Sequence, residues 1–301
     1  MGRVFLFPAF TLKYKGNELL FLKQNGIDTD KELHLLSDLC QIDLSCFDTE
    51  RCSFLETPLE NQLLTYFFSC RYYDLTMGKI PDPSVTTGMS MGIYAALYAG
   101  GFFPFQTGAH IIKEVYNALA IHFQKDSYSM LSVIGLDENE VQQIISSKHL
   151  NCSVAVANGV HSYIISGALS DLNEFKLIAL NKGAISAKLM PSTIPFHTTY
   201  VKSAENKLHA LLKTDHFSNG RLPYFSPLSK SFIYEGRHAM KEIVDNITHK
   251  IYWHSLMETL IKHGYNDFVA CGPGDSLKRI AAFIPGDFNM IHARQIISDC
   301  I

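Results

Sequence analysis

Apolar positions along this chain follow two spacings, one typical of strands and one typical of helices. Short runs of β-branched and aromatic residues predict strands at 4–7 and 84–87. Apolar residues at helical spacing predict a helix over 59–73, and another apolar helix starts near residue 93, directly after a glycine-rich turn. Helix, strand, sharp turn and helix follow one another in the order that an α/β sheet requires.

The pattern changes after about residue 128, where shorter strands alternate with helices. It predicts, in order, a strand, a helix, two strands joined by a short turn, a helix and a strand, at 130–134, 137–147, 154–158, 162–166, 170–182 and 185–190. This β-α-β-β-α-β order is the ferredoxin-like pattern. We therefore expect a small subdomain at 128–196, inserted into a large domain formed by 1–127 and 197–301. Within the second part of the large domain, further helices and one strand are predicted at 198–212, 239–247, 254–263, 267–271 (the strand) and 275–283.

Composition narrows the classes of protein that these elements could form. The chain has 301 residues, 47% of them hydrophobic and 18% charged, as in an ordinary globular enzyme. The formal net charge is -3 and the Lys and Arg residues are scattered, which argues against nucleic-acid binding. Seven cysteines form no C-x-x-C pair and thirteen histidines lack metal-ligand spacing, so we expect reduced thiols and no metal. No run reaches the roughly 18 apolar residues of a membrane span and no signal peptide is recognisable, so we expect a cytoplasmic protein without membrane contact.

The glycine-rich turn is the first candidate for chemistry. Gly88-Met89-Ser90-Met91-Gly92 is a Gly-x-Ser-x-Gly sequence between a predicted strand and a predicted helix. Such a turn exposes a serine hydroxyl at the start of a helix, where developing negative charge is favoured. Ser90 is therefore a candidate nucleophile, although the same five residues also fit an ordinary turn. A nucleophilic serine needs a base, and His197 lies on a loop that enters a predicted helix, where its side chain can point back into a cleft.

Five segments together resemble one enzyme family. Their order and spacing are similar to those of malonyl-CoA:acyl carrier protein transacylases, over nearly the whole chain. The segments are Phe5-Leu6-Phe7-Pro8, Gly88 to Gly92, Asn158 with Ile165-Ser166-Gly167, Ile194-Pro195-Phe196-His197, and Phe268 to Gly274. The resemblance implies an α/β fold, in which an α/β-hydrolase-like large domain carries an inserted ferredoxin-like small subdomain.

The resemblance also implies a mechanism. Ser90 would accept an acyl group from an acyl-coenzyme A thioester, and His197 would act as its base. The backbone carbonyl of Asn246 would orient the histidine, and the N–H groups of Met91 and Phe10 would form the oxyanion hole. The acceptor would be the phosphopantetheine thiol of an acyl carrier protein, and no cofactor would be bound.

Three positions of this chain depart from the family pattern. The family usually has Gln at Phe10, His at Met89, and near Val115 an Arg that pairs with the free malonyl carboxylate. No arginine occurs between Arg71 and Arg221, so a shift of the alignment does not restore this residue. A buried carboxylate without a charged partner would cost several kcal/mol. Lys113 is the nearest cation in sequence, although a lysine on that helix is more simply solvated.

The departures predict an apolar acyl pocket, with Met89, Val115, Asn158 and Phe196 as its lining. We expect an acyl group without a second carboxylate, either acetyl or a longer monocarboxylic chain. Asn158 also fits a plain turn residue before Gly159. Two other functions stay open: hydrolysis of acyl groups from stalled carrier proteins, and an inactive homologue that only docks a carrier protein. The presence of both Ser90 and His197 argues against the inactive homologue.

Overall fold

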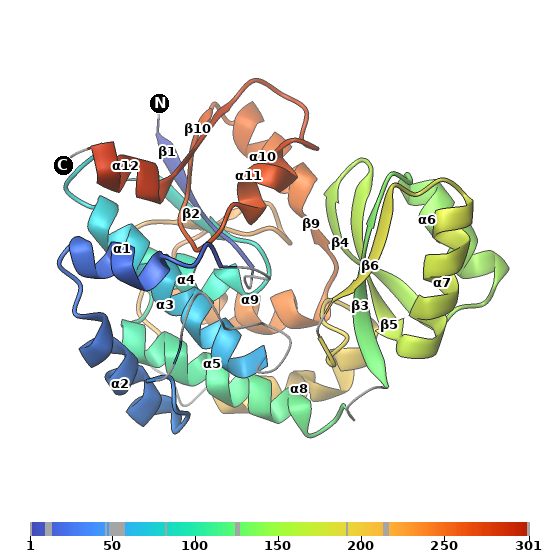
Figure 1. The fold of residues 1–301 in the computed structure, drawn as a ribbon, viewed down its shortest axis with the longest axis horizontal. Coiled ribbons are helices and arrows are strands. Elements are labelled where there is room, and N and C mark those ends of the chain that lie inside the picture. Colours follow the sequence, from blue (N-terminus) through green and yellow to red (C-terminus); the bar gives the residue numbers. More distant parts are fainter. Residues whose placement is uncertain are drawn as a thin grey trace.

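The computed structural model describes residues 2–9, 14–45, 47, 58–81, 83–123, 127–190, 192–212 and 217–299. Figure 1 shows a large α/β part, which holds both termini, and a smaller lobe at one side of it. None of the described helices combines the length and the apolar composition that a membrane span requires.

A six-stranded sheet forms the centre of the large part. Its strand order is β11-β10-β1-β2-β7-β8, and every neighbouring pair is parallel except β7 and β8. The strands are β1 (Arg3–Phe7), β2 (Val85–Gly88), β7 (Tyr224–Phe225), β8 (Phe232–Ile233), β10 (Asp267–Ala270) and β11 (Asn289–His292). Since β1 pairs with β2 and with β10 in parallel, the loops that follow these three strands meet at one edge of the sheet.

Both faces of this sheet are covered, and the alternation along β1 shows how. Phe5 and Phe7 pack into a core formed with α3, α4 and α5, whereas Val4 and Leu6 pack into a second core formed with α10. Side chains of a strand alternate between its two faces, so the apolar run of β1 fits a strand buried on both sides.

The helices of the large part differ in how far they are buried. The helix predicted over 59–73 is confirmed as α3, which is buried on nearly all sides because it lies between other helices. The large-part helices are α1 (Glu18–Gln24), α2 (Thr29–Cys40), α3 (Pro58–Thr76), α4 (Gly92–Gly100), α5 (Phe105–Ala120), η1 (Thr199–Ala204), α8 (Glu205–Leu212), α9 (Gly236–Thr248), α10 (Trp253–Lys262), α11 (Ser276–Ala281) and α12 (Ala293–Asp299). The single helix expected over 198–212 is wrong in its first part, because η1 is a 3-10 helix.

The smaller lobe has the predicted β-α-β-β-α-β order. Its sheet has the order β6-β3-β5-β4-β9, and helices α6 and α7 pack against one face. Its elements are β3 (Tyr128–Ile134), α6 (Glu138–Ser147), β4 (Cys152–Gly159), β5 (Ser162–Ala168), α7 (Leu169–Asn181), β6 (Ser186–Met190) and β9 (Ile251–Tyr252). Asp137 and Glu140 form a capping box that fixes the start of α6.

Strand β9 connects the lobe to the large part. It lies far along the chain from the other four strands, yet it pairs in parallel with β4 between Val156 and Ile251 and between Ala157 and Tyr252. Sequence analysis did not find it, because two residues carry no periodic pattern. The same reason applies to β7 and β8, which were also not predicted.

Candidate active site

Ser90 lies on a sharp turn between β2 and α4. Its φ angle is 53°, in the left-handed region that non-glycine residues seldom occupy. The two glycines of the turn are required by close approach. A Cβ on Gly88 would lie 2.2 Å from the backbone carbon of Gly92, and one on Gly92 would lie 2.2 Å from the carbonyl oxygen of Phe7. The turn therefore holds Ser90 in a strained conformation against the end of β1.

His197 links Ser90 to helix α9 through two hydrogen bonds. The distance between Ser90 Oγ and His197 Nε2 is 2.6 Å, and His197 Nδ1 lies 2.5 Å from the carbonyl oxygen of Asn246. A carbonyl oxygen can only accept, so Nδ1 carries the hydrogen and Nε2 presents a lone pair to the serine hydroxyl. The backbone N–H of His197 also donates to the carbonyl of Ile247 at 2.8 Å, and its φ is 63°.

Burial sets the protonation state of His197. Only 3% of the residue is exposed, and burial lowers the pKa of His197 to about 4. The imidazole is therefore neutral at neutral pH, with the lone pair of Nε2 available for a proton. A neutral imidazole beside a hydroxyl is the arrangement that general-base catalysis needs.

Asn246 contacts both members of the pair. Besides its carbonyl bond to His197, its side-chain Nδ2 donates to the carbonyl oxygen of Ser90 at 3.1 Å. Sequence analysis assigned only the backbone of this residue. One residue of α9 therefore fixes the position of the serine backbone and the orientation of the imidazole.

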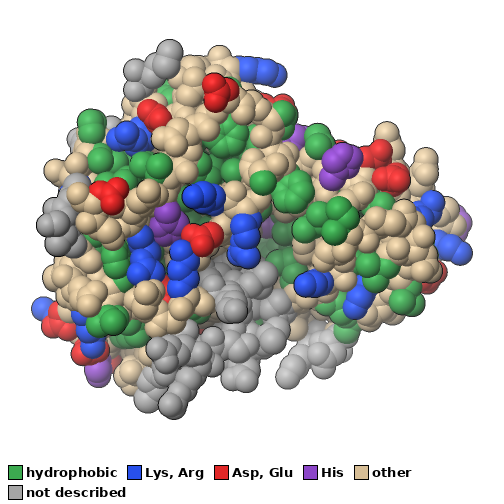
Figure 2. Space-filling view, turned by 45° about the horizontal axis from the view of Figure 1, so that its top comes forward, with side chains coloured by type: hydrophobic (Ala, Val, Ile, Leu, Met, Phe, Trp, Pro, Cys, Tyr) green, Lys and Arg blue, Asp and Glu red, His purple; other side chains and the backbone are tan. Residues whose placement is uncertain are grey.

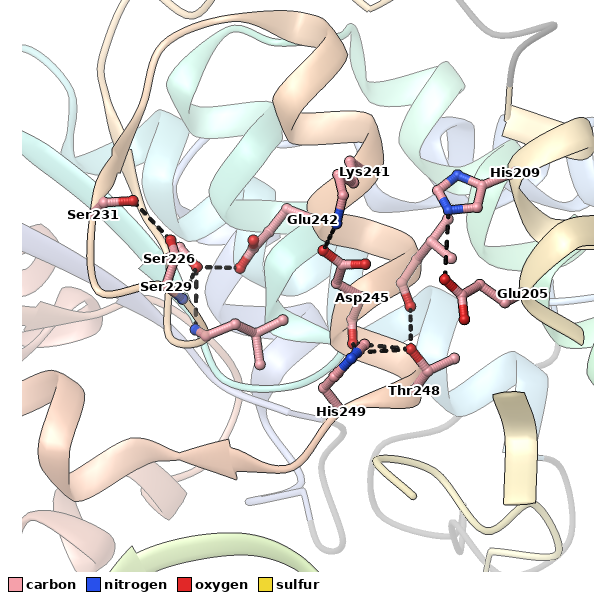
Figure 3. A network of polar contacts seen from close by, with 12 residues as sticks. Glu205, His209, Ser226, Ser229, Ser231, Lys241, Glu242, Asp245, Thr248 and His249 are labelled. Atoms are coloured by element: carbon pink, nitrogen blue, oxygen red, sulfur yellow. Dashed lines mark hydrogen bonds and ion pairs between the residues drawn. The ribbon is translucent and has the colours of Figure 1, made fainter. Parts of the chain in front are cut away.

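Helix α9 is itself held by a polar network along its length (Figure 3). The hydroxyl of Ser226 donates to Glu242 Oε1 at 2.6 Å and accepts from the backbone N–H groups of Leu228 and Ser229. Burial raises the pKa of Glu242 to about 7. The helix that carries Asn246 thus contains a buried carboxyl group that titrates near neutral pH.

Two cavities adjoin Ser90, His197 and Phe196, which line both. The larger one, of about 340 Å³, lies between the large part and the sheet of the smaller lobe, and its lining includes Met89 and Asn158. The smaller cavity has a volume of about 30 Å³. Its lining includes Val115, the remaining residue predicted for the pocket. Other residues that line it are Tyr94, Tyr116, Ile247 and Gln62.

The structure thus brings together all but one of the residues predicted for the site. Met91 follows Ser90 and is the N-cap residue of α4. Its backbone N–H donates to no acceptor among the described residues. Phe10, the second predicted oxyanion donor, lies outside the described residues. Lys113 is not in the lining of either cavity and lies close to Cys40, whose pKa it lowers against the effect of burial.

Sequence analysis missed Gln62, Tyr94, Tyr116 and Arg279. The first three lie on helices α3, α4 and α5, where nothing in the local pattern distinguishes a cavity residue from a core residue. Arg279 lines the larger cavity from α11. Its position follows a Gly-Pro-Gly turn after strand β10, and loops at the carboxyl ends of parallel strands commonly carry ligand sites. Among the described residues, no group of three His, Cys, Asp or Glu side chains is placed to hold a metal ion.

Comparison with known proteins finds similar sequences of one kind. No protein-family model matches the chain. The polyketide biosynthesis malonyl CoA-acyl carrier protein transacylase PksC of Bacillus subtilis is 26% identical over 236 residues, 74% of this chain and 80% of that protein. The malonyl CoA-acyl carrier protein transacylase of Synechocystis sp. is 24% identical over 253 residues, 82% of this chain and 83% of that protein. In sequence the chain is similar to malonyl-CoA:acyl carrier protein transacylases over most of its length.

Solved structures show the same fold as this chain. The crystal structure of acyl-carrier-protein S-malonyltransferase from Bartonella henselae has a TM-score of 0.88 at 23% identity, over 100% of this chain and 98% of that one. A malonyl-transacylase in complex with its type II polyketide synthase acyl carrier protein has a TM-score of 0.89 at 17% identity, over 100% of both chains. These likenesses confirm the predicted fold class, an α/β-hydrolase-like large domain with a ferredoxin-like small subdomain.

The lowered pKa of His197 predicts an unusual pH profile for the reactivity of Ser90. Labelling of Ser90 by a serine-directed acylating reagent should stay nearly constant from about pH 8 to 5.5 and fall to half near pH 4, since only the neutral imidazole accepts the proton. The rate of labelling would be measured against pH, with circular dichroism at each pH to verify folding. A profile with its midpoint near the ordinary histidine pKa of about 6.5 contradicts the assignment.

The buried Glu242 predicts a pH-dependent stability. Its folded pKa is raised, so the native state binds the proton more tightly, and stability falls as pH rises toward and through about 7. Glu242→Gln keeps the shape and stays neutral. We expect the stability of the unaltered protein to fall relative to Glu242→Gln by about 2 kcal/mol between about pH 5.5 and 8. Urea unfolding at several pH values measures this, and parallel curves for the two proteins would refute the buried titration.

Proposed function

We propose that this chain transfers a short monocarboxylic acyl group, best fitted by acetyl, from coenzyme A to the phosphopantetheine thiol of an acyl carrier protein. The observation that carries the proposal is the smaller cavity beside Ser90, which has no cationic side chain in its described lining. The relatives are malonyl transferases by name, and one of them is bound to its carrier protein. These relatives support the class of donor and acceptor, and the cavity supports an acyl group without a second carboxylate.

In the first step Ser90 Oγ attacks the thioester carbonyl carbon while its proton moves to His197 Nε2. The imidazolium that forms is stabilised by the bond from Nδ1–H to the carbonyl oxygen of Asn246. The N–H of Met91 and that of Phe10 would hold the oxyanion. Collapse of the tetrahedral intermediate breaks the C–S bond, and the departing thiolate takes the proton from His197.

In the second step the same groups act in reverse order. His197 Nε2 takes the proton of the incoming phosphopantetheine thiol, and the thiolate attacks the acyl-serine carbonyl carbon. The C–O bond to Ser90 then breaks, and Oγ recovers the proton from His197. A base that is neutral at rest serves both steps without a change of site.

The lining and volume of the smaller cavity support a small, uncharged acyl group. Val115, Tyr94 and Tyr116 give it an apolar wall, and Gln62 contributes only a neutral amide. A malonyl carboxylate placed there would lose its hydration without gaining a charged partner, which costs several kcal/mol. A volume of about 30 Å³ is sufficient for a group the size of the acetyl methyl and insufficient for a long chain.

Acyl-enzyme formation tests the donor. With acetyl-CoA the protein should form a covalent adduct at Ser90 at least about tenfold faster than with malonyl-CoA, since one unpaired buried carboxylate outweighs 1.4 kcal/mol. Intact-mass spectrometry over time measures both rates, with Ser90→Ala as the control that forms no adduct. A strong preference for malonyl-CoA would show that the apolar wall has been misread.

The fate of the acyl group tests the acceptor. Acyl-enzyme mixed with holo carrier protein should deliver most of its acetyl group to the carrier thiol. Predominant release of free acid would assign the same Ser90 and His197 to hydrolysis of acylated carrier proteins instead. Holo and apo carrier protein form the matched pair for this experiment, since only the first has the thiol.

A further inference from the structure

Arg279 is the one cationic side chain among the described lining residues of the larger cavity, since His197 is neutral. Arg279 lies on α11, far along the chain from Val115, near which the family arginine was expected. It is exposed, and its guanidinium forms no ion pair or hydrogen bond with the described residues. A planar guanidinium that forms no hydrogen bond or ion pair with the described residues, at the edge of a ligand cavity, is available for an anion.

The acidic residue in the described lining of the larger cavity has a basic partner, Lys15, and the charge of Arg279 also helps to lower the pKa of its carboxyl group. Asp275 lines the same cavity, but its carboxylate lies 3.0 Å from Lys15 Nζ. Lys278, also exposed, adds a further positive charge beside Arg279. The edge formed by Lys15, Asp275, Lys278 and Arg279 therefore has more positive than negative charge. Figure 2 shows Lys and Arg side chains gathered near the middle of the face where the two parts of the molecule meet.

The position of Arg279 relative to Ser90 shows which half of the substrate it would meet. Ser90 lines both cavities, Val115 lines only the smaller one and Arg279 only the larger one. If the acyl group occupies the smaller cavity, as the proposed function has it, the thiol half of the thioester extends through the larger one. Both coenzyme A and a holo carrier protein present that half as a pantetheine arm ending in a phosphate ester.

We propose that Arg279 binds the phosphate at the end of the pantetheine arm, in both the donor and the acceptor. This inference rests on the proposed function. The arm would pass the apolar side chains of Met130 and Ile164, which line the cavity from the sheet of the smaller lobe. The phosphate would then be met at the exposed edge, where Arg279 can make two parallel N–H bonds to it.

Two probes that differ by one phosphate test the proposal. The Ser90→Ala protein should bind 4′-phosphopantetheine about tenfold more tightly than pantetheine at low salt, as measured by calorimetry. Adding Arg279→Gln should reduce this ratio to about two or less while leaving pantetheine binding unchanged. Lys278→Gln is the matched control, because it removes the same charge from the neighbouring residue, and it should keep most of the ratio.

Three results would overturn the proposal. They are equal binding of the two probes by the Ser90→Ala protein, equal loss of both probes in Arg279→Gln, and the same loss of ratio in Lys278→Gln as in Arg279→Gln. A further measurement separates the phosphate from an acyl carboxylate. If Arg279→Gln slows acyl-enzyme formation from malonyl-pantetheine but not from acetyl-pantetheine, the guanidinium serves the acyl group and the proposal fails.

The binding experiment is independent of the chemistry. If the Ser90→Ala protein shows the phosphate-dependent ratio but the unaltered protein forms no acyl-enzyme, the proposed function is contradicted and the Arg279 site stays in place. An acyl-enzyme that forms readily without any phosphate-dependent ratio would contradict the Arg279 site and leave the proposed function in place.

Discussion

A chain of hydrogen bonds from Ser90 through His197 to Asn246 is the constraint on which the rest of this site depends. It joins three segments that are far apart in sequence: the turn between β2 and α4, the loop before η1, and helix α9. The side chain of Asn246 closes the chain by donating to the Ser90 carbonyl. His197 Nδ1 donates to a backbone carbonyl and not to a carboxylate. The cost of desolvating an ionised carboxylate at this position is therefore avoided.

Strain and burial support that chain together. Ser90 and His197 both have positive φ angles, which cost of order 1–3 kcal/mol each and persist only where the surroundings enforce them. The close approach of Gly88, Gly92 and Phe7 enforces the conformation at Ser90. Burial of His197 makes the imidazole a neutral group that can accept the proton of the Ser90 hydroxyl.

Charge is distributed unevenly about the nucleophile. Among its described lining residues the small cavity has no cationic side chain and two amides, Gln62 and Asn246, whereas the large cavity is lined by Arg279. The relatives named above are malonyl transferases, and the proposed function relies on this difference between the described linings of the two cavities. The arrangement favours a donor that is neutral at its acyl end and anionic at the far end of its pantetheine arm.

Much of the fold could be predicted because long apolar repeats are local. Helix α3, strands β1 and β2 and the β-α-β-β-α-β order of the smaller lobe each have enough residues for a period to be recognised. Strands β7, β8 and β9 have two residues each, and they form only because neighbouring strands supply partners for their backbone groups. The 3-10 helix at Thr199–Ala204 likewise could not be distinguished from the start of an α-helix by spacing.

The sequence by itself determined the candidate nucleophile, the candidate base and the absence of an arginine near Val115, because these depend on which residue types occur in which motif. Only the tertiary structure decided that the Asn246 side chain also holds Ser90, that Lys113 lies away from the site, and that Arg279 lines the larger cavity. These depend on segments that are far apart in the chain, 156 residues in the case of Asn246 and Ser90. Their geometry is set by how β2, β10 and α9 pack around one sheet edge, and no local pattern records that packing.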